Sequence, residues 1–450
     1  MKFLNKQFTQ ETLKLALPVM LTQVGQVSVN LFDNIIVGKL LGAKALAAVS
    51  LGNAMFFSIF IFGLGFSLAI PPLVSEAHSQ HDHNRINSIF RHGFVVNIIL
   101  AFVLMLLIFG IIPLMPYLNQ PKEILPDTIT FLSIVTLSII PFMIFQTMRE
   151  VSEGLSFTIG VTKATIFANI INVILNYVFI EHFKMGVAGS AWATFIARVA
   201  MMVFLYYVLI KEEKTRRYIK DFSLKIKDFT KEMFEKLIRL GFPTAWQLFF
   251  EVTAFAGAAF ICGLISAKDI AAHQIALSMA SFTFNLCVGF SVASTVMIGR
   301  KLGEKDFVNL EKVGFNNLKI AFIFMLMCGL VFIIGKDVLP TFFTKKEDIA
   351  VVELASQLMI IAALFQLSDG IQVTALGCLR GIQDVKIPSI LTFIAYWVIT
   401  IPLGYYLTVP MKMGAFGMWI ALGIGLTISA VLLVIRFRNL SEKRIKAQSN

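Results

Sequence analysis

The chain has 450 residues, of which 57% are hydrophobic and only 15% are charged, and its formal net charge is +12. Soluble domains are about 45–50% apolar, so this composition excludes an ordinary soluble enzyme and is typical of a polytopic membrane protein. The basic surplus could indicate a nucleic-acid partner, but the charges are concentrated between the apolar runs.

Twelve apolar stretches are long enough to cross a bilayer, which takes about 20 residues. In chain order, we predict spans at 13–37, 45–75, 92–113, 127–147, 163–181, 187–210, 237–265, 271–299, 314–335, 348–379, 387–409 and 415–435. The N-terminus has no short apolar core followed by a cleavage site, so we expect no removable signal peptide.

Lysine and arginine are distributed unevenly between the two sides of this arrangement. With the N-terminus in the cytoplasm, the cytoplasmic segments and the adjoining ends of the spans hold 29 of them, and the external loops hold 9. Basic residues gather on the cytoplasmic side of membrane proteins, so both termini are predicted to be cytoplasmic. The net charge therefore reflects topology, together with some attraction to anionic lipid.

The two halves of the chain repeat each other. The stretch from Leu40 to Gly52 resembles the stretch from Leu264 to Ala276 at an offset of 224, and Gly65-Phe66-Ser67 recurs as Gly289-Phe290-Ser291. Each half holds six spans, and because six is even, the halves share one orientation as parallel repeats.

These repeats predict three parts: an N-terminal six-helix lobe at 1–210, a basic cytoplasmic linker at 211–239 and a C-terminal lobe at 240–450. The linker holds ten Lys or Arg residues and is expected to lie on the bilayer surface. Two bundles joined in this way are typical of transporters whose halves rock. We also expect places where a helix bends between states in the second span, at Gly63, Gly65 and Pro71-Pro72, and in the tenth, at Gly370 and Gly377.

Three acidic residues lie deep inside predicted spans: Asp33, Glu251 and Asp369. A charged side chain at the bilayer centre costs about 2.5–3.5 kcal/mol on insertion scales, so such residues usually handle ions or protons. The alternative is a structural charge held by a buried partner. Arg198, inside the sixth span, could pair with a carboxylate or extend to the membrane surface, and the sequence leaves both open.

The fifth span carries Asn172 and Asn176, which are four residues apart and share one helix face. With Asp33 and Thr194, their oxygens would form a small cage suited to a hard cation such as Na⁺. Equally, the two asparagines could bond neighbouring helices as packing contacts.

The sequence shows no pattern of an enzyme. There is no phosphate-binding loop and no nucleophile–base pair, and we predict no catalytic residue and no cofactor apart from a coupling ion. The cysteines form no CxxC pair and are predicted to be buried free thiols, without a disulfide or a resident metal: Cys262, Cys287, Cys328 and Cys378.

Several of these stretches match one family in order. The chain resembles the MATE (multidrug and toxic compound extrusion) transporters, NorM-like branch, over nearly its whole length. The resemblance rests on FFEVTAF at Phe249 to Phe255, on FQLSDGIQVTALGCLRGIQD at Phe365 to Asp384, on Phe32-Asp33, on LGAKALAAVS and on the asparagine pair of the fifth span.

The resemblance implies an all-α fold of two six-helix lobes around a central V-shaped cleft, in a bacterial inner membrane. It implies that a monomer exports cationic or amphipathic drugs in exchange for Na⁺ or H⁺, without a nucleic-acid partner. Glu251 and Asp369 match the acidic residues of the family's C-terminal lobe. The cation site of its N-terminal lobe is matched by Asp33, Asn172, Asn176 and Thr194.

Phe250 and Phe365 are candidates for lining the cleft. Relatives can carry Tyr at the position of Phe365, so the missing hydroxyl leaves proton binding at the C-terminal acids more open. The alternatives are a flippase for lipid-linked sugars, which would be expected to line its cleft with basic residues, and a membrane-embedded enzyme or receptor.

Overall fold

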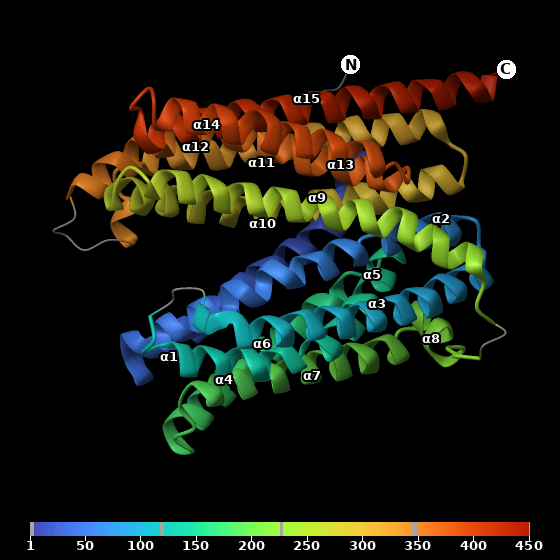
Figure 1. Cartoon of the computed structure of the whole chain (residues 1–450). Coiled ribbons are helices and arrows are strands. Elements are labelled where there is room, and N and C mark those ends of the chain that lie inside the picture. The colour runs from blue at the N-terminus through green and yellow to red at the C-terminus, as the bar shows by residue number, and fades with distance from the viewer. Residues whose placement is uncertain (1–3, 118–120, 226–227, 344–348, 450) are drawn as a thin grey trace. The chain divides into compact units, whose positions relative to one another are not determined.

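The computed structural model of the chain describes residues 4–117, 121–225, 228–343 and 349–449. All regular elements in these ranges are helical (Figure 1), which confirms the all-α prediction. The α-helices are α1 (Lys6–Ser67), α2 (Ile70–Ser79), α3 (His83–Ile111), α4 (Leu125–Leu137), α5 (Ile139–Gly154), α6 (Ile159–Tyr177), α7 (Gly186–Lys211), α8 (Glu213–Lys220), α9 (Lys231–Gly263), α10 (Ala267–Gly303), α11 (Phe307–Gly335), α12 (Ile349–Gly381), α13 (Lys386–Phe393), α14 (Ile401–Thr408) and α15 (Gly414–Ser449).

Ten stretches of the described chain are long and apolar enough to cross a membrane, and the bent pair α4 and α5 forms an eleventh. The first of them runs over Lys6–Ser79, far longer than one crossing needs. It is interrupted at Gly42, where φ is 86° and ψ is 178°, so that two helices meet there. Counting these two helices separately gives the twelve spans that the sequence predicts.

The chain forms two compact units, which are described separately. The N-terminal unit comprises Leu21–Ala245, and the C-terminal unit comprises Trp246–Asn450 together with Met1–Met20. The helices α1 and α9 therefore each contribute residues to both units. The division into lobes and linker at 210 and 240 follows chain order and stays a prediction, although α9 already begins at Lys231.

The backbone confirms the parallel repeat at its turns. Positive φ angles outside glycine recur in pairs 224 to 228 residues apart: His81 (54°) and Lys305 (57°), Ser156 (66°) and Gln383 (63°), Lys184 (53°) and Lys412 (55°). Residues other than glycine seldom adopt this conformation, so its return at matching places shows that the halves share their turns as well as their helices.

The break expected from glycine and proline is found in the second span. In the second span, the chain breaks between α1 and α2, and Pro71 and Pro72 lie in the first turn of α2, where proline is tolerated. In the tenth span, α12 is continuous from Ile349 to Gly381, and bending there stays a prediction. Gly377 also serves close packing, because a Cβ there would lie 2.3 Å from the carbonyl oxygen of Ser291.

Close packing of α10 on α12 builds the core of the C-terminal unit. The Thr295 hydroxyl donates to the carbonyls of Ser291 and Gly377, each at 3.0 Å. Small residues that let helix backbones approach in this way are typical of contacts between transmembrane helices.

Large apolar side chains lie on the surface of both units. Phe260 and Leu106, for example, are 69% and 66% exposed, as expected of surfaces that face lipid.

Candidate functional site

The two acidic residues predicted deep inside spans of the C-terminal unit act on each other electrostatically. Glu251 is on α9 and Asp369 on α12; their exposed fractions are 7% and 3%, and the two carboxyl groups interact electrostatically. Neither position is at a helix end, so each side chain is fixed by a continuous helix. Two buried carboxyl groups whose charges act on each other are suited to binding a proton or a cation.

Tyr396 adds a hydroxyl group to this pair. It lies in a π-helical turn, Ile394–Thr400, is fully buried, and interacts with both Glu251 and Asp369. Its hydroxyl also donates to Gln372 Oε1 at 3.0 Å. Phe365 lacks a hydroxyl, and Tyr396 supplies one from a different helix. We did not predict this residue from the sequence, where it stands as one aromatic among many.

A buried arginine completes the group in the C-terminal unit. Arg380, in the last turn of α12, is 8% exposed, and its charge acts on Glu251. Its guanidinium donates to Gln247 Oε1 at 3.4 Å, one helical turn before Glu251 on α9. Arg380 directly follows the predicted tenth span, 348–379. The structure shows that α12 continues to Gly381, which brings Arg380 into the helix.

In the N-terminal unit, the structure brings together three of the four predicted cation ligands. The Asn176 amide donates to Asp33 Oδ1 at 2.6 Å and to Asn172 Oδ1 at 3.4 Å, and all three residues are buried. Among the described residues, Asn176 Oδ1 has no hydrogen-bond partner. A carboxylate with neighbouring amide oxygens suits a hard cation. The hydroxyl of Thr194, in contrast, donates to the Ser190 carbonyl of its own helix.

Arg198 is held inside the N-terminal unit. Its guanidinium donates to the Ser138 hydroxyl at 2.6 Å and lies 4.8 Å from the ring centroid of Phe56. Its charge also acts on Asp33. The structure thus holds Arg198 inside the unit by a hydroxyl group and an aromatic ring, and pairing with a carboxylate stays a prediction.

The two candidate lining residues lie in aromatic clusters of the C-terminal unit. Phe250 stacks on Trp246 with ring centroids 5.3 Å apart and contacts Phe393 at 4.8 Å. Phe365 is 3% exposed and packs against Trp419 at 5.5 Å. Their role in lining a binding cleft stays a prediction.

A second buried ion group lies on α5, beyond the predicted end of the fourth span. Arg149 donates to Glu153 at 2.7 Å, and Glu150 accepts from Gln146. The fourth span was predicted to end at 147, but α5 continues to Gly154 and carries these residues into the core of the N-terminal unit.

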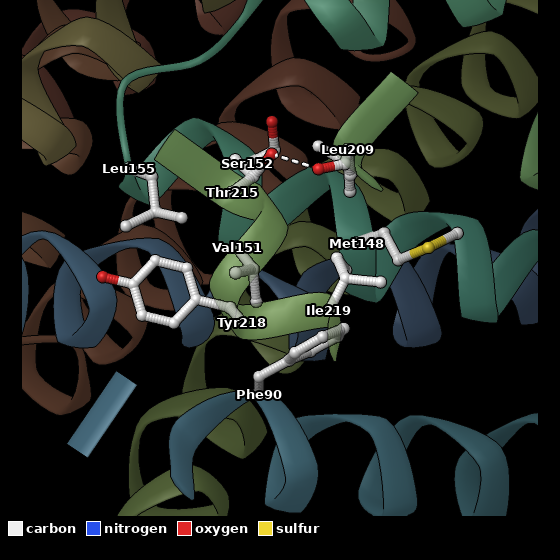
Figure 2. Close-up of a pocket in the computed structure, with 9 residues that line it drawn as sticks. All are labelled: Phe90, Met148, Val151, Ser152, Leu155, Leu209, Thr215, Tyr218 and Ile219. Carbon is white, nitrogen blue, oxygen red and sulfur yellow. Dashed lines mark hydrogen bonds between the residues drawn. The ribbon is translucent and has the colours of Figure 1, made fainter. Parts of the chain in front are cut away.

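Figure 2 shows a small cavity in the N-terminal unit where α8 packs on the bundle. Its volume of about 10 Å³ is at the lower limit for a single water, and its wall is almost wholly apolar. Ser152 and Tyr218 are among its lining residues, but none of the predicted site residues is. It is a packing gap beneath the linker helix and no candidate for a binding site.

Twelve spans in two parallel repeats, with buried carboxyl groups in both units, define a membrane transporter of the secondary, ion-coupled class. A model of the MatE family matches residues 18–178 and 243–406, and the chain belongs to this family.

Comparison with known proteins agrees with this assignment over the full length. The chain is 32% identical to the multidrug resistance protein NorM of Photobacterium profundum, covering 96% of this chain and 95% of that protein. It is 30% identical to the multidrug resistance protein MdtK of Yersinia pseudotuberculosis, again covering 96% and 95%. It is therefore a transporter and not an enzyme.

Solved structures share the fold at low sequence identity. A crystal structure of MATE in the bent conformation superposes with a TM-score of 0.89 at 19% identity, covering 98% of this chain and 97% of that one. A eukaryotic MATE transporter superposes with a TM-score of 0.87 at 17% identity, covering 98% and 99%.

Proposed function

We propose that the protein exports organic cations across a bacterial inner membrane in exchange for Na⁺ or H⁺, as a monomer with both termini in the cytoplasm. The names of its bacterial relatives, NorM and MdtK multidrug resistance proteins, support drug substrates. The observation that carries the proposal is the buried group of Glu251, Asp369 and Tyr396 in the C-terminal unit.

This group can couple two cations because both need the same negative charge. When the carboxyl groups hold a proton or Na⁺, their charge is neutralised, and an organic cation gains little from binding beside them. An organic cation bound there expels the proton or ion for the same reason. Such reciprocity between two ligands is the thermodynamic form of antiport. The concentration gradient of the ion drives the exchange, and the membrane potential adds about 2.3 kcal/mol per 100 mV for each net charge that is moved.

The N-terminal unit supplies a second place for the coupling ion. Asp33 with the carbonyl oxygens of Asn172 and Asn176 offers oxygen ligands, which suit Na⁺, and the carboxyl group of Asp33 could equally hold a proton. The proposed exchange therefore uses acids in both units, with the organic cation bound beside Glu251.

Competition between ions and a fluorescent organic cation tests the proposal. Ethidium binding to the purified protein is measured by fluorescence while NaCl or acid is added. We expect the affinity for ethidium to fall as either ion rises, and we expect Glu251→Gln to weaken ethidium binding about tenfold and to remove most of this competition. If the ethidium affinity of Glu251→Gln fell with NaCl and acid as much as that of the wild type, a coupling role of Glu251 would be contradicted.

A further inference from the structure

The structural repeat shows that Arg380 is not needed by the turn in which it lies. In the second half, the amide of Gln383 bonds to the Arg380 carbonyl at 2.8 Å; in the first half, the amide of Ser156 bonds to the Glu153 carbonyl at the same distance. Gln383 and Ser156 are the paired residues with positive φ. The same turn therefore forms with a glutamate where the second half has Arg380, so the arginine has another reason to be there.

The surroundings of Arg380 indicate that reason. Arg380 is 8% exposed, donates to Gln247 at 3.4 Å, and places its charge within range of Glu251. At the repeat-related position, Glu153 is neutralised on its own helix by Arg149 at 2.7 Å. Arg380 instead directs its charge across to α9.

The net charge of Glu251, Asp369 and Arg380 determines how many cations this group of side chains can bind. With both carboxyl groups ionised, Glu251 and Asp369 carry two negative charges and Arg380 one positive charge, so the group has a net charge of −1. Burying uncompensated charge is costly, so the group is neutralised by one positive charge and resists a second. One proton, one Na⁺ or one monovalent organic cation fulfils this condition.

We propose that Arg380 limits the charge capacity of this site to one, which makes the organic cation and the coupling ion mutually exclusive and selects monovalent over divalent cations. The inference rests on the proposed function, because it assumes that organic cations bind beside Glu251. Without Arg380, the group would carry a net charge of −2 and could accept a dication, or an organic cation and a proton together.

Two dyes with the same ring system test the charge capacity directly. Ethidium carries one positive charge and propidium two, and their dissociation constants are measured by fluorescence on the purified, detergent-solubilised chain. The readout is the ratio of the two constants, because a merely structural loss would weaken both dyes alike. We expect Arg380→Gln to shift this ratio about tenfold or more towards propidium, while Arg380→Lys keeps the wild-type ratio.

Arg436→Gln serves as the matched control. Arg436 is also paired within the C-terminal unit, donating to Asp384 at 3.0 Å, and its loss removes the same charge from another place. We expect the control to keep the wild-type ratio. A ratio within twofold of the wild type in a folded Arg380→Gln protein, or an equal shift in Arg436→Gln, would overturn the proposal.

A double variant keeps the test decisive if Arg380→Gln alone does not fold. Glu251→Gln reduces the net charge of the group to zero, and adding Arg380→Gln returns it to −1. We therefore expect the double variant to bind ethidium more tightly than Glu251→Gln does, and to prefer ethidium to propidium. Weaker or equal ethidium binding would contradict the charge count. A wild-type protein that binds neither dye would contradict the proposed function itself, and this inference with it.

Discussion

Asp33 is the only formal charge among the three residues that the N-terminal unit brings together as candidate cation ligands. We expect Asp33→Asn to abolish ion-coupled export while the protein still folds and inserts, because the amide keeps the size of the side chain and lacks its charge. Drug resistance of cells producing equal amounts of variant and wild type measures this. Resistance at the wild-type level would remove Asp33 from the coupling site.

Asn176→Ala should separate a ligand role from a packing role. An amide oxygen is a good ligand for Na⁺ and contributes little to an organic cation, so we expect the variant to lose affinity for Na⁺ more than for ethidium. Asn169→Ala is the matched control, because the Asn169 amide donates to the Gly25 carbonyl at 2.8 Å and joins two helices. Equal losses of both affinities in Asn176→Ala, as in the control, would favour packing.

The sequence identified those site residues that are polar within an apolar run, and missed those whose role depends on contacts between distant segments. Asp33, Glu251, Asp369 and the asparagine pair stand out because burying them is costly. Arg380 and Tyr396 do not stand out. The arginine lies at a helix end where a basic residue is ordinary. Its interaction with Gln247 on α9, 133 positions earlier in the chain, is visible only in the structure.

At the scale of helices, the contact between α10 and α12 leaves no room for a side chain at Gly377. A Cβ at Gly377 would lie 2.3 Å from the Ser291 carbonyl oxygen, whereas one at Gly423 on α15 would meet nothing within 4 Å. We expect Gly377→Ala to lower the free energy of unfolding by about 1–3 kcal/mol, the usual cost of overpacking. Gly423→Ala should be neutral or slightly stabilising. Thermal unfolding in detergent measures both, and equal effects would contradict the close approach.

The start of α11 depends on a capping carboxylate. Asp306 Oδ1 accepts from the backbone amide of Asn309 at 3.2 Å, as Asp82 accepts from Arg85 at the start of α3. Burial acts to raise the pKa of Asp306, but the hydrogen bonds from Asn309 and the charge of Lys301 outweigh it, so this pKa lies below the usual value of 3.8.

This lowered pKa gives the cap a pH dependence of known sign. A depressed acid stabilises the folded state at pH above its unfolded value, and this contribution is lost as pH falls through the folded pKa. We expect Asp306→Ala to cost about 1 kcal/mol near neutral pH and progressively less below about pH 4. Asp306→Asn, which keeps a capping oxygen, should cost only a few tenths. A cost that stays constant down to pH 3 would contradict the account.

Apolar length predicted the twelve spans well, because a helix in lipid must satisfy its own backbone hydrogen bonds over the full bilayer thickness. Bends were harder to predict, since glycine can allow either a bend or a close contact. At Gly377 only the position of Ser291 on another helix reveals the close contact. The sequence also did not show how far helices extend past the apolar stretches, and the fourth span was therefore predicted to end at 147, before Arg149 on α5.

For the whole molecule, topology is the simplest prediction to test. A cysteine in place of Lys220, exposed at the end of α8, should react with a membrane-permeant thiol reagent and not with an impermeant one added outside intact cells. Lys122→Cys, in an exposed loop predicted to be external, is the matched control and should react with both. The reverse pattern would invert the orientation inferred from the basic residues.

Gradient-driven transport in proteoliposomes tests the central claim most directly. Ethidium movement is followed by fluorescence after a Na⁺ or H⁺ gradient is imposed separately on vesicles holding the wild type or Glu251→Gln. Ion-coupled export predicts that the wild type moves ethidium against its gradient with at least one of the two ions, that this movement stops when the gradient is dissipated, and that Glu251→Gln loses it. Accumulation that is independent of both gradients, or that Glu251→Gln retains in full, would contradict it.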